Sequence, residues 1–299
     1  MKHYNMIGLM SGTSLDGLDV VDVSFKKDRE WNYEINHSKC YKYSKEWLTN
    51  LKEASNLSGN DLLVLNQKYG NYLGHLINQF ILEKNISINN IDAIASHGHT
   101  IFHQPKQKLT FQLGCGAAIA NKTQLTVVND FRSLDVAFGG QGAPLVPVGD
   151  ELLFNQFDYC LNFGGIANIS FNKKNKRIAG DIGFANMFSN KLSQKIGKEF
   201  DKNGELAKSG SLNKKMLEHL ITLSYYLKGF PKSLGIEDFE EWYFPTIDKF
   251  KIPIEDKLHT AGHHLCLSVS NIIKKDKSVL ITGGGAYNSF WIDCLKNDY

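Results

Sequence analysis

A glycine-rich polar loop lies between two apolar runs near the start of the chain, within residues 6–23, MIGLMSGTSLDGLDVVDV. The first run, residues 6–10, predicts a β-strand. The second, residues 18–23, alternates apolar and acidic residues as a half-buried strand does. The sequence therefore predicts a tight hairpin whose tip offers backbone N–H groups and hydroxyls to an oxyanion. Taken alone, this segment fits an ordinary hairpin turn equally well.

Two further segments repeat the pattern of a strand followed by glycines. Residues 160–171, CLNFGGIANISF, predict a strand, a glycine turn and a second strand, and residues 279–288, VLITGGGAYN, predict a buried strand that runs into three glycines. Three such turns in both halves of the chain favour phosphate binding over an ordinary hairpin. The P-loop pattern GxxxxGK[ST] and the complete dinucleotide pattern GxGxxG are both absent from the sequence, which removes the two commonest phosphate-binding classes.

Composition narrows the class of protein. With 299 residues, of which 42% are hydrophobic, the chain is long enough for two domains. A net charge of +3 is too weak to indicate nucleic-acid binding. The basic run at residues 172–177, NKKNKR, fits a solvated hairpin turn better than a phosphate-binding patch. Five scattered cysteines without CxxC spacing indicate reduced thiols, and no segment predicts a signal peptide or a membrane span. We therefore expect a soluble cytoplasmic protein.

Between the glycine turns, helix-like and strand-like segments alternate, which predicts a mixed α/β fold. The helix-like segments are residues 44–55, 62–83, 185–196, 213–227 and 257–274. The strand-like segments are residues 93–96, 109–113, 125–128, 159–163 and 279–282. A stretch rich in glycine and proline at residues 139–150, GGQGAPLVPVGD, predicts the boundary between two domains, residues 1–148 and 149–299.

Five strings carry a resemblance to a known family. GLMSGTSLDGLD, SHGHT, DFRSLDVAFGGQGAPLVP, LNFGGIANIS and LITGGGAYN, in this order, resemble the anhydro-N-acetylmuramic acid kinases of the sugar kinase, actin and Hsp70 superfamily. The resemblance extends from Ile7 to at least Leu295. It implies a two-domain actin-like ATPase fold of the ribonuclease H-like type, with mixed sheets flanked by helices and a cleft between the domains for ATP and sugar.

The resemblance also implies which residues bind ATP. The first loop and the LNFGGIANIS hairpin would hold the phosphates, and the GGG turn would lie against the adenosine. The residues assigned in this way are Gly12, Thr13, Ser14, Leu15, Asp16, Gly17, Leu18, Asp19, Gly164, Gly165, Asn168, Gly283, Gly284 and Gly285.

The implied reaction joins hydrolysis to phosphorylation in peptidoglycan recycling. Family members phosphorylate the 6-oxygen of 1,6-anhydro-N-acetylmuramate while water opens the anhydro bridge, giving N-acetylmuramate 6-phosphate. A carboxylate must take a proton from that water. In the segment GDIGFANMF, Asp181 matches the family's base and Asn186 its asparagine, although Ile182, Phe184 and Ala185 depart from the commoner residues. Without the resemblance, Asp181 also fits an N-cap of the helix expected near Ala185.

Two other segments, within SHGHT and GGQGAP, match the family's sugar-binding residues, and Arg132 and Asn186 are assigned with them. The residues carried over are Ser96, His97, Gly98, Thr100, Arg132, Gly140, Gln141, Gly142, Ala143, Pro144 and Asn186. The guanidinium of Arg132 suits a lactyl carboxylate or a phosphate, and an ion pair with Asp130 or Asp135 is an equally good interpretation.

Two positions depart from what such enzymes usually carry. His99 stands in place of a glutamine, so that His97, His99 and His103 form an HxHxxxH pattern, with His97 and His99 expected on one face of a strand. Substrate contact or packing explains these histidines better than a metal site, because no cysteine or carboxylate at ligand spacing accompanies them. Met10 stands where sugar kinases and actin carry an aspartate near Mg²⁺, a feature that the family shares. We therefore expect Mg²⁺ to be held through waters and by other carboxylates, with Asp16 and Asp19 as candidates.

The chain ends at Tyr299, shortly after the GGG turn, whereas the family continues. Two hypotheses follow: a kinase that uses ATP and Mg²⁺, or a truncated remnant that binds the anhydrosugar or a nucleotide without catalysis. A sugar kinase with another substrate is a third, which the GGQGAPL string disfavours. The resemblance also implies a homodimer, with small molecules rather than nucleic acid or membrane as partners.

Overall fold

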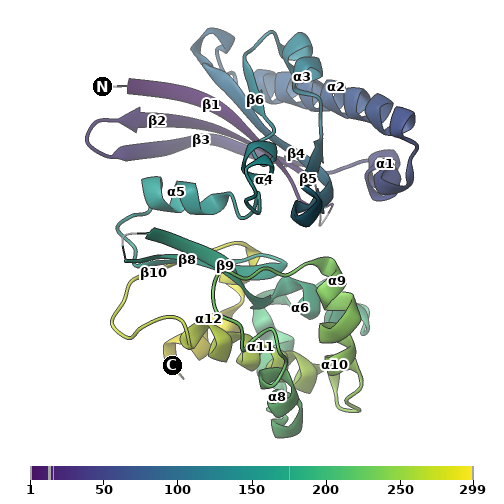
Figure 1. Cartoon of the computed structure of the whole chain (residues 1–299), viewed down its shortest axis with the longest axis vertical. Coiled ribbons are helices and arrows are strands. Elements are labelled where there is room, and N and C mark those ends of the chain that lie inside the picture. The colour runs from purple at the N-terminus through teal and green to yellow at the C-terminus, as the bar shows by residue number, and fades with distance from the viewer. Residues whose placement is uncertain (1, 13–14, 16, 175, 298–299) are drawn as a thin grey trace. The chain divides into compact units, whose positions relative to one another are not determined.

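The computed structural model describes residues 2–12, 15, 17–174 and 176–297. The chain divides into two compact units, Met1–Leu145 and Val146–Tyr299. Each unit has a β-sheet with helices against it (Figure 1) and its own hydrophobic core, and the two cores have no residue in common.

The first unit contains a six-stranded mixed sheet. Its strands are β1 (Lys2–Ser11), β2 (Leu18–Lys27), β3 (Trp31–Tyr41), β4 (Ala93–Gln104), β5 (Leu109–Leu113) and β6 (Val127–Asn129). The strand order is β3-β2-β1-β4-β5, and β6 pairs with the N-terminal part of β4. β1, β2 and β3 form an antiparallel meander, and β4 runs parallel to β1 on its other side. A mixed sheet with helices against it agrees with the mixed α/β fold that the resemblance implies.

Three helices form the core of this unit with the sheet. They are α1 (Lys45–Glu53), α2 (Gly59–Glu83) and α3 (Gly116–Thr123), and the short α4 (Ser133–Ala137) follows β6. The hydroxyls of Ser44 and Ser58 cap α1 and α2 by accepting hydrogen bonds from backbone N–H groups three residues later. The buried face of α2 includes Leu73, Ile77 and Phe80, at helical spacing, and packs with the apolar side of the sheet.

A β-bulge in β4 changes which side chains share a face. Leu9 of β1 pairs with Ser96, but Ser11 pairs with His99, so β4 has one more residue than β1 between these pairs. Gly98 takes a left-handed conformation at φ 72°, and a Cβ there would lie 2.6 Å from the Leu113 carbonyl oxygen. As a result Ser96 and His99 are both buried toward the helices, whereas His97 lines the opposite face. The prediction that His97 and His99 share one face is therefore wrong.

The second unit contains a four-stranded mixed sheet. Its strands are β7 (Tyr159–Phe163), β8 (Ile166–Lys173), β9 (Lys176–Phe184) and β10 (Val279–Thr282), in the order β10-β7-β8-β9. β7, β8 and β9 form an antiparallel meander, and β10 runs parallel to β7. The hairpin turn predicted within residues 172–177 is confirmed, because Lys173 pairs with Lys176.

Helices cover both faces of this second sheet. α5 (Val146–Leu153) contacts β9 on one face. The remaining helical elements are α6 (Asn186–Gln194), α7 (Glu205–Ser209), α8 (Lys214–Ile221), α9 (Ile236–Asp238), a π-helical turn (Phe239–Tyr243), α10 (Phe244–Asp248), α11 (Ile254–Ser270) and α12 (Ser289–Asn297). Leu258, Leu265 and Val269 of α11 are buried in the core, as their helical spacing predicts.

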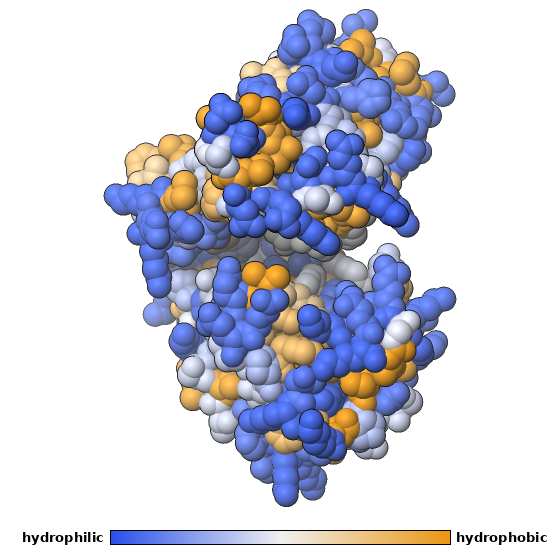
Figure 2. Space-filling model, turned by 90° about the vertical axis from the view of Figure 1, so that its right-hand side faces the viewer, coloured by the Kyte–Doolittle hydropathy of each residue, from blue (hydrophilic) through white to orange (hydrophobic). Residues whose placement is uncertain are grey.

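Two mixed α/β units confirm the expected fold class. On the face drawn in Figure 2 the surface is mostly hydrophilic, and apolar residues gather in separate patches. Over the part of the chain that the structure describes, no helix has both the length and the apolar character needed to cross a membrane.

Candidate active site

The loop at residues 12–17 joins β1 to β2, as the predicted hairpin requires. Ser11 and Leu18 pair across its base, and the Leu15 N–H donates to the Gly12 carbonyl at 3.2 Å. A Cβ at Gly17 would lie 2.7 Å from the Tyr41 carbonyl oxygen, so only glycine lets the loop lie this close to the end of β3. The remaining loop residues expected to bind ATP, Thr13, Ser14 and Asp16, lie outside the described residues.

Arg132 connects the GGQGAP segment to β4. Its Nε and Nη2 donate to His97 Nε2 at 3.0 and 2.9 Å, and its Nη1 donates to the Gly142 carbonyl at 2.6 Å. The Gly142 N–H donates in turn to Asp135 Oδ2 at 2.7 Å. The side chains of Arg132 and Asp135 thus hold the segment next to α4, and Gln141, Ala143 and Pro144 of the segment are exposed.

His97 is a neutral acceptor in this arrangement. Its Nε2 accepts from Arg132, and its Nδ1 lies 2.9 Å from the Gly98 carbonyl, so we assign the ring proton to Nδ1. Burial and the charge of Arg132 lower the pKa of His97. Neither Asp130 nor Asp135 forms an ion pair with Arg132 in the described structure. The guanidinium charge therefore stays without a carboxylate partner there.

A cavity of about 570 Å³ lies on the sheet face of the first unit that His97 occupies. Met10, Ala95 and Phe131 give it a mainly apolar lining, and Asp19 is exposed at its border. The Asp19 carboxylate has no hydrogen bond or ion pair in the described part of the chain. Two other expected sugar-binding residues lie elsewhere on β4: Ser96 is buried toward the helices, and Thr100 follows the bulge, paired with Gln112 of β5.

In the second unit two glycine turns pack together. One joins β7 to β8 at Gly164 and Gly165, and the other follows β10, which is the parallel neighbour of β7. A Cβ at Gly283, where φ is 81°, would lie 2.7 Å from the Phe163 carbonyl oxygen. A Cβ at Gly285 would lie 2.6 Å from the Phe163 Cβ. Glycine is thus required for this contact, which leaves Gly165, Gly283 and Gly284 exposed.

Asn186 holds the first of these turns. It is the first residue of α6, and its Nδ2 donates to the carbonyls of Phe163 and Gly164 at 3.0 and 2.8 Å. Its backbone N–H also donates to the Gly164 carbonyl at 3.1 Å. The Asn186 amide nitrogen is thus occupied by the turn, and only its Oδ1 is left for a ligand.

Asp181 lies on β9, in register with Asn168 of β8. Its Oδ2 accepts a hydrogen bond from the Leu234 N–H at 2.8 Å, whereas Oδ1 has no hydrogen bond in the described part of the chain. Burial raises the pKa of Asp181 to about 6, and the Leu234 hydrogen bond opposes part of that rise. The N-cap interpretation fails, because α6 begins at Asn186 and Ala185 occupies its N-cap position.

The segment at residues 225–235, which holds Asp181 in place, is missed by sequence reasoning. The Tyr225 hydroxyl donates to the Asp181 carbonyl at 2.8 Å, and the Asp181 N–H donates to the Lys232 carbonyl at 2.9 Å. A Cβ at Gly180 would lie 2.7 Å from that Lys232 oxygen. The glycines of the GDIG string are the one local signal that another segment approaches β9 here.

The family model of the anhydro-N-acetylmuramic acid kinases matches residues 4–298. The chain belongs to this family. The anhydro-N-acetylmuramic acid kinase of Shewanella pealeana is 35% identical over 306 residues, which cover 97% of this chain and 82% of that relative. The kinase of Photobacterium profundum is 34% identical over 303 residues, covering 94% of this chain and 80% of that relative.

Among solved structures, component A of the (R)-2-hydroxyglutaryl-CoA dehydratase of Acidaminococcus fermentans aligns with this kinase-family chain at a TM-score of 0.47 and 10% sequence identity. The alignment covers 99% of this chain and 88% of the other.

The HxHxxxH histidines of this anhydro-N-acetylmuramic acid kinase-family chain have three separate sets of partners. His97 contacts Arg132, His99 Nδ1 lies 2.8 Å from Ser11 Oγ, and His103 Nδ1 lies 3.1 Å from Thr110 Oγ1. Within the described ranges, no group of three or more histidine, cysteine, aspartate or glutamate side chains is placed to hold a metal ion.

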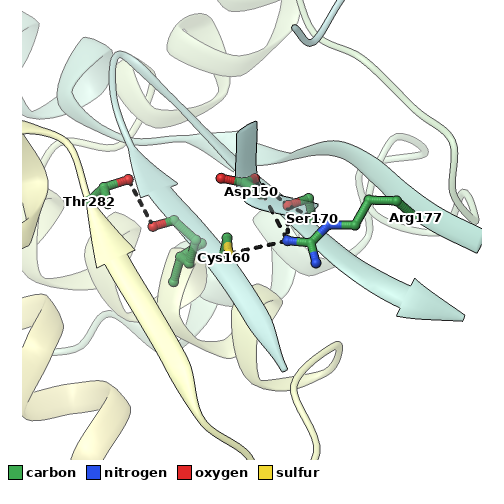
Figure 3. Close-up of polar contacts among 6 residues, drawn as sticks. Asp150, Cys160, Ser170, Arg177 and Thr282 are labelled. Atoms are coloured by element: carbon green, nitrogen blue, oxygen red, sulfur yellow. Dashed lines mark hydrogen bonds and ion pairs between the residues drawn. The ribbon is translucent and has the colours of Figure 1, made fainter. Parts of the chain in front are cut away.

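A buried polar cluster fastens α5 to the sheet of the second unit (Figure 3). The Ser170 hydroxyl donates to Asp150 Oδ2, and Arg177 Nη2 donates to Ser170 Oγ at 2.8 Å and to Cys160 Sγ at 3.2 Å. Burial raises the pKa of Asp150, an effect that the hydrogen bond from Ser170 opposes. The cluster joins the first helix of this unit to three of its strands.

Proposed function

We propose that this chain is an ATP-dependent anhydro-N-acetylmuramic acid kinase. It opens 1,6-anhydro-N-acetylmuramate with water and phosphorylates the released 6-oxygen, giving N-acetylmuramate 6-phosphate in peptidoglycan recycling. The observation that carries the proposal is the carboxylate of Asp181, which is half-buried with one oxygen fixed by Leu234 and the other without a hydrogen bond among the described residues. Membership of the family supplies the reaction to which this carboxylate is assigned.

Asp181 acts as the general base for the attacking water. With a pKa of about 6 it is mostly ionised at neutral pH and is a stronger base than an ordinary aspartate. Water attacks the anomeric carbon, its proton passes to Oδ1, and the bond from C1 to the 6-oxygen breaks. The electron pair left on the 6-oxygen attacks the γ-phosphorus, and ADP leaves with the bridging oxygen. The proton on Asp181 then passes to solvent.

The glycine turns are assigned to the nucleotide. Phosphoryl transfer depends mainly on positioning and on stabilising charge, and exposed backbone N–H groups supply both. We assign the phosphates to the first loop, residues 12–19, and to the turn at Gly164 and Gly165 with Asn168. The GGG turn is assigned to the adenosine, and the exposure of Gly283 and Gly284 supports that role.

Arg132 is assigned to the carboxylate of the sugar's lactyl group. Three of its five N–H groups donate to His97 and Gly142, so two remain for a ligand. Its charge has no carboxylate partner in the described structure, which supports an anionic ligand. The proposed sugar contacts are completed by His97, Gly98 and Thr100, by residues 140–144 of the GGQGAP segment, and by the Asn186 Oδ1.

Mg²⁺ is the proposed metal, and when bound it would neutralise phosphate charge. Mg²⁺ usually keeps several waters and uses one or two carboxylates together with substrate phosphates, so a site with few protein ligands suits it. Asp19 fits this role, because its carboxylate is exposed and has no partner among the described residues. Asp16, the other candidate, lies outside them.

Isotope labelling tests the reaction. Purified protein is incubated with ATP, Mg²⁺ and 1,6-anhydro-N-acetylmuramate in ¹⁸O water, and the product is examined by mass spectrometry. We expect a 6-phosphorylated sugar with ¹⁸O at C1. Absence of this product, with nucleotide or sugar binding still seen by calorimetry, would favour a non-catalytic binding protein instead.

Replacing Asp181 tests the base. Asp181→Asn keeps a side chain of the same size that still accepts from Leu234, so we expect both ligands to bind with kcat lowered about 10²- to 10⁴-fold. Full activity in this variant would remove Asp181 from the role.

We also propose that the protein acts in the cytoplasm as a homodimer, as its family implies. Light scattering after gel filtration, at several protein concentrations, measures the oligomeric state. A monomer at all concentrations contradicts the dimer.

A further inference from the structure

Four polar side chains meet in the core of the first unit, at the base of the hairpin where Ser11 pairs with Leu18. Ser11 is the last residue of β1, and its Oγ lies 2.6 Å from the Tyr43 hydroxyl and 2.8 Å from His99 Nδ1. The Tyr43 hydroxyl lies 2.7 Å from that of Tyr69 in α2. All four residues are buried. Residues Ser11, Tyr43, Tyr69 and His99 therefore form a continuous hydrogen-bonded chain, here called the Ser11 relay.

The direction of the hydrogen bonds follows from two facts together: the protonation state of His99 and the number of hydroxyl protons in the relay. Burial lowers the pKa of His99 to about 4, so the ring is neutral at pH 7. Each hydroxyl donates one proton. When Tyr69 donates to Tyr43, Tyr43 to Ser11 and Ser11 to His99 Nδ1, every hydroxyl proton in the relay is used. We therefore assign the ring proton of His99 to Nε2.

The relay contacts the backbone where the loop begins. Ser11 pairs with Leu18 across the base of the hairpin and with His99 of β4, and Gly12 is the next residue along the chain. Ile7 and Leu9, on the same side of β1, are apolar core residues. The polar chain is thus placed at the one core position of β1 that adjoins the loop, where buried hydroxyls are costly unless all are satisfied.

We propose that the Ser11 relay is a positioning device that holds the start of the loop in the orientation needed to bind the nucleotide phosphates. This inference rests on the proposed function, in which residues 12–19 bind ATP. The four side chains are positioning residues and do not touch the substrate. The relay acts by removing the rotational freedom of Ser11 and of the peptide that follows it.

A matched pair of hydroxyl deletions tests the relay. Tyr43→Phe breaks it in the middle. Tyr72→Phe makes the same chemical change in the same aromatic cluster, where the Tyr72 ring lies 6.4 Å from that of Tyr43, and no hydrogen bond of the Tyr72 hydroxyl occurs in the described structure. We expect Tyr43→Phe to raise the KM for ATP about five- to tenfold with the KM for the anhydrosugar unchanged. Tyr72→Phe should change neither.

Substitutions at His99 provide a rescue. In His99→Gln the side-chain Oε1 can accept the hydrogen bond from Ser11. In His99→Leu the side chain has no acceptor. We expect the Gln variant to keep an ATP KM close to that of the unmodified protein and the Leu variant to match Tyr43→Phe. Equal KM values in the Gln and Leu variants overturn the relay.

Hydrogen exchange separates failure of the relay from failure of the proposed function, because it needs no activity. In the ligand-free protein, we expect the backbone amides of residues 12–18 to exchange faster in Tyr43→Phe than in Tyr72→Phe or the unmodified chain. If the unmodified chain forms no product, the proposed function fails. The comparison of amide exchange rates between the variants still tests the relay. Unchanged exchange in Tyr43→Phe, or equal acceleration in both variants, overturns it.

Discussion

Burial has two consequences for Asp181 in its proposed role as a base: it makes the carboxylate more basic, and it lowers the fraction that is ionised at a given pH. A base of this kind works only when it is ionised. With a pKa of about 6 in the ligand-free protein, we expect kcat/KM to fall about tenfold for each pH unit below 6, and to level off above pH 7. Steady-state rates between pH 4.5 and 8, with circular dichroism to check folding, measure this. A residual rate of Asp181→Asn that shows the same dependence on pH would assign it to another group.

His264 illustrates a residue whose burial affects stability. It lies in α11 with its Nδ1 buried and without a hydrogen-bond partner among the described residues, and its ring meets that of Tyr226 edge-on at 4.3 Å. Burial lowers its pKa to about 3. In the unfolded chain this histidine binds a proton near pH 6.5, whereas in the native state it stays neutral down to about pH 3. The free energy of unfolding therefore falls as pH drops from 6.5 toward 3.

We therefore expect His264→Leu to weaken the loss of stability between pH 7 and pH 5. Urea unfolding at several pH values measures the slope of the free energy of unfolding against pH, which is independent of any constant packing cost of the substitution. His75→Leu is the control, since His75 is exposed on α2 and its replacement should leave the slope unchanged. Equal slopes in His264→Leu and the unmodified chain contradict the prediction.

At the level of elements, β4 depends on the left-handed glycine at its bulge. In Gly98→Ala the new Cβ meets the Leu113 carbonyl at 2.6 Å and the positive φ is strained, so we expect a loss of about 1–3 kcal/mol in the free energy of unfolding. Gly59→Ala, in the first turn of α2 with open space around it, should be neutral or stabilising by up to about 1 kcal/mol. Chemical denaturation of both variants measures the difference. Similar losses in the two would show that the bulge carries no special strain.

The predictability of the elements depends on how much of each is buried. β1, β2, β7 and β10 are predictable because their apolar patterns are local. β3 is missed although Trp31, Tyr33 and Ile35 alternate with polar residues. It is an edge strand in which only Tyr41 is buried. The expected helix at 213–227 ends at Ile221, where the Thr222 hydroxyl donates to the carbonyls of Glu218 and His219. The expected link at 139–150 runs into α5, whose Pro147 is tolerated in the first turn.

The candidate site is predictable where its residues sit in glycine turns, and not where distant segments meet. The strings at residues 160–171 and 279–288 indicate two turns, and the structure packs them together around Phe163. The contact of Leu234 with Asp181 joins positions 53 residues apart, and no periodicity in the sequence marks it. The bulge at Gly98 is equally hidden, because it depends on the register between β1 and β4.

For the whole molecule, the separate cores of the two units predict separate folding. Fragments spanning residues 1–145 and 146–299 each retain a complete core, so we expect each to fold alone. Trp31 and Trp47 report on the first fragment and Trp242 and Trp291 on the second, through fluorescence during urea unfolding. Cooperative transitions in both fragments support the prediction. Fragments that fold only when mixed contradict it.

The glycine in β4 also shapes how this strand can change. In a regular strand, neighbours two apart share one environment, so a substitution at one restricts the choice at the other. Across Gly98 that link is broken: His97 faces the open cavity and His99 the packed interior. A saturation scan should therefore find two unrelated tolerance profiles at these positions, set by polarity at 97 and by volume at 99. A substitution at position 97 can thus change the cavity lining without disturbing the packing at position 99.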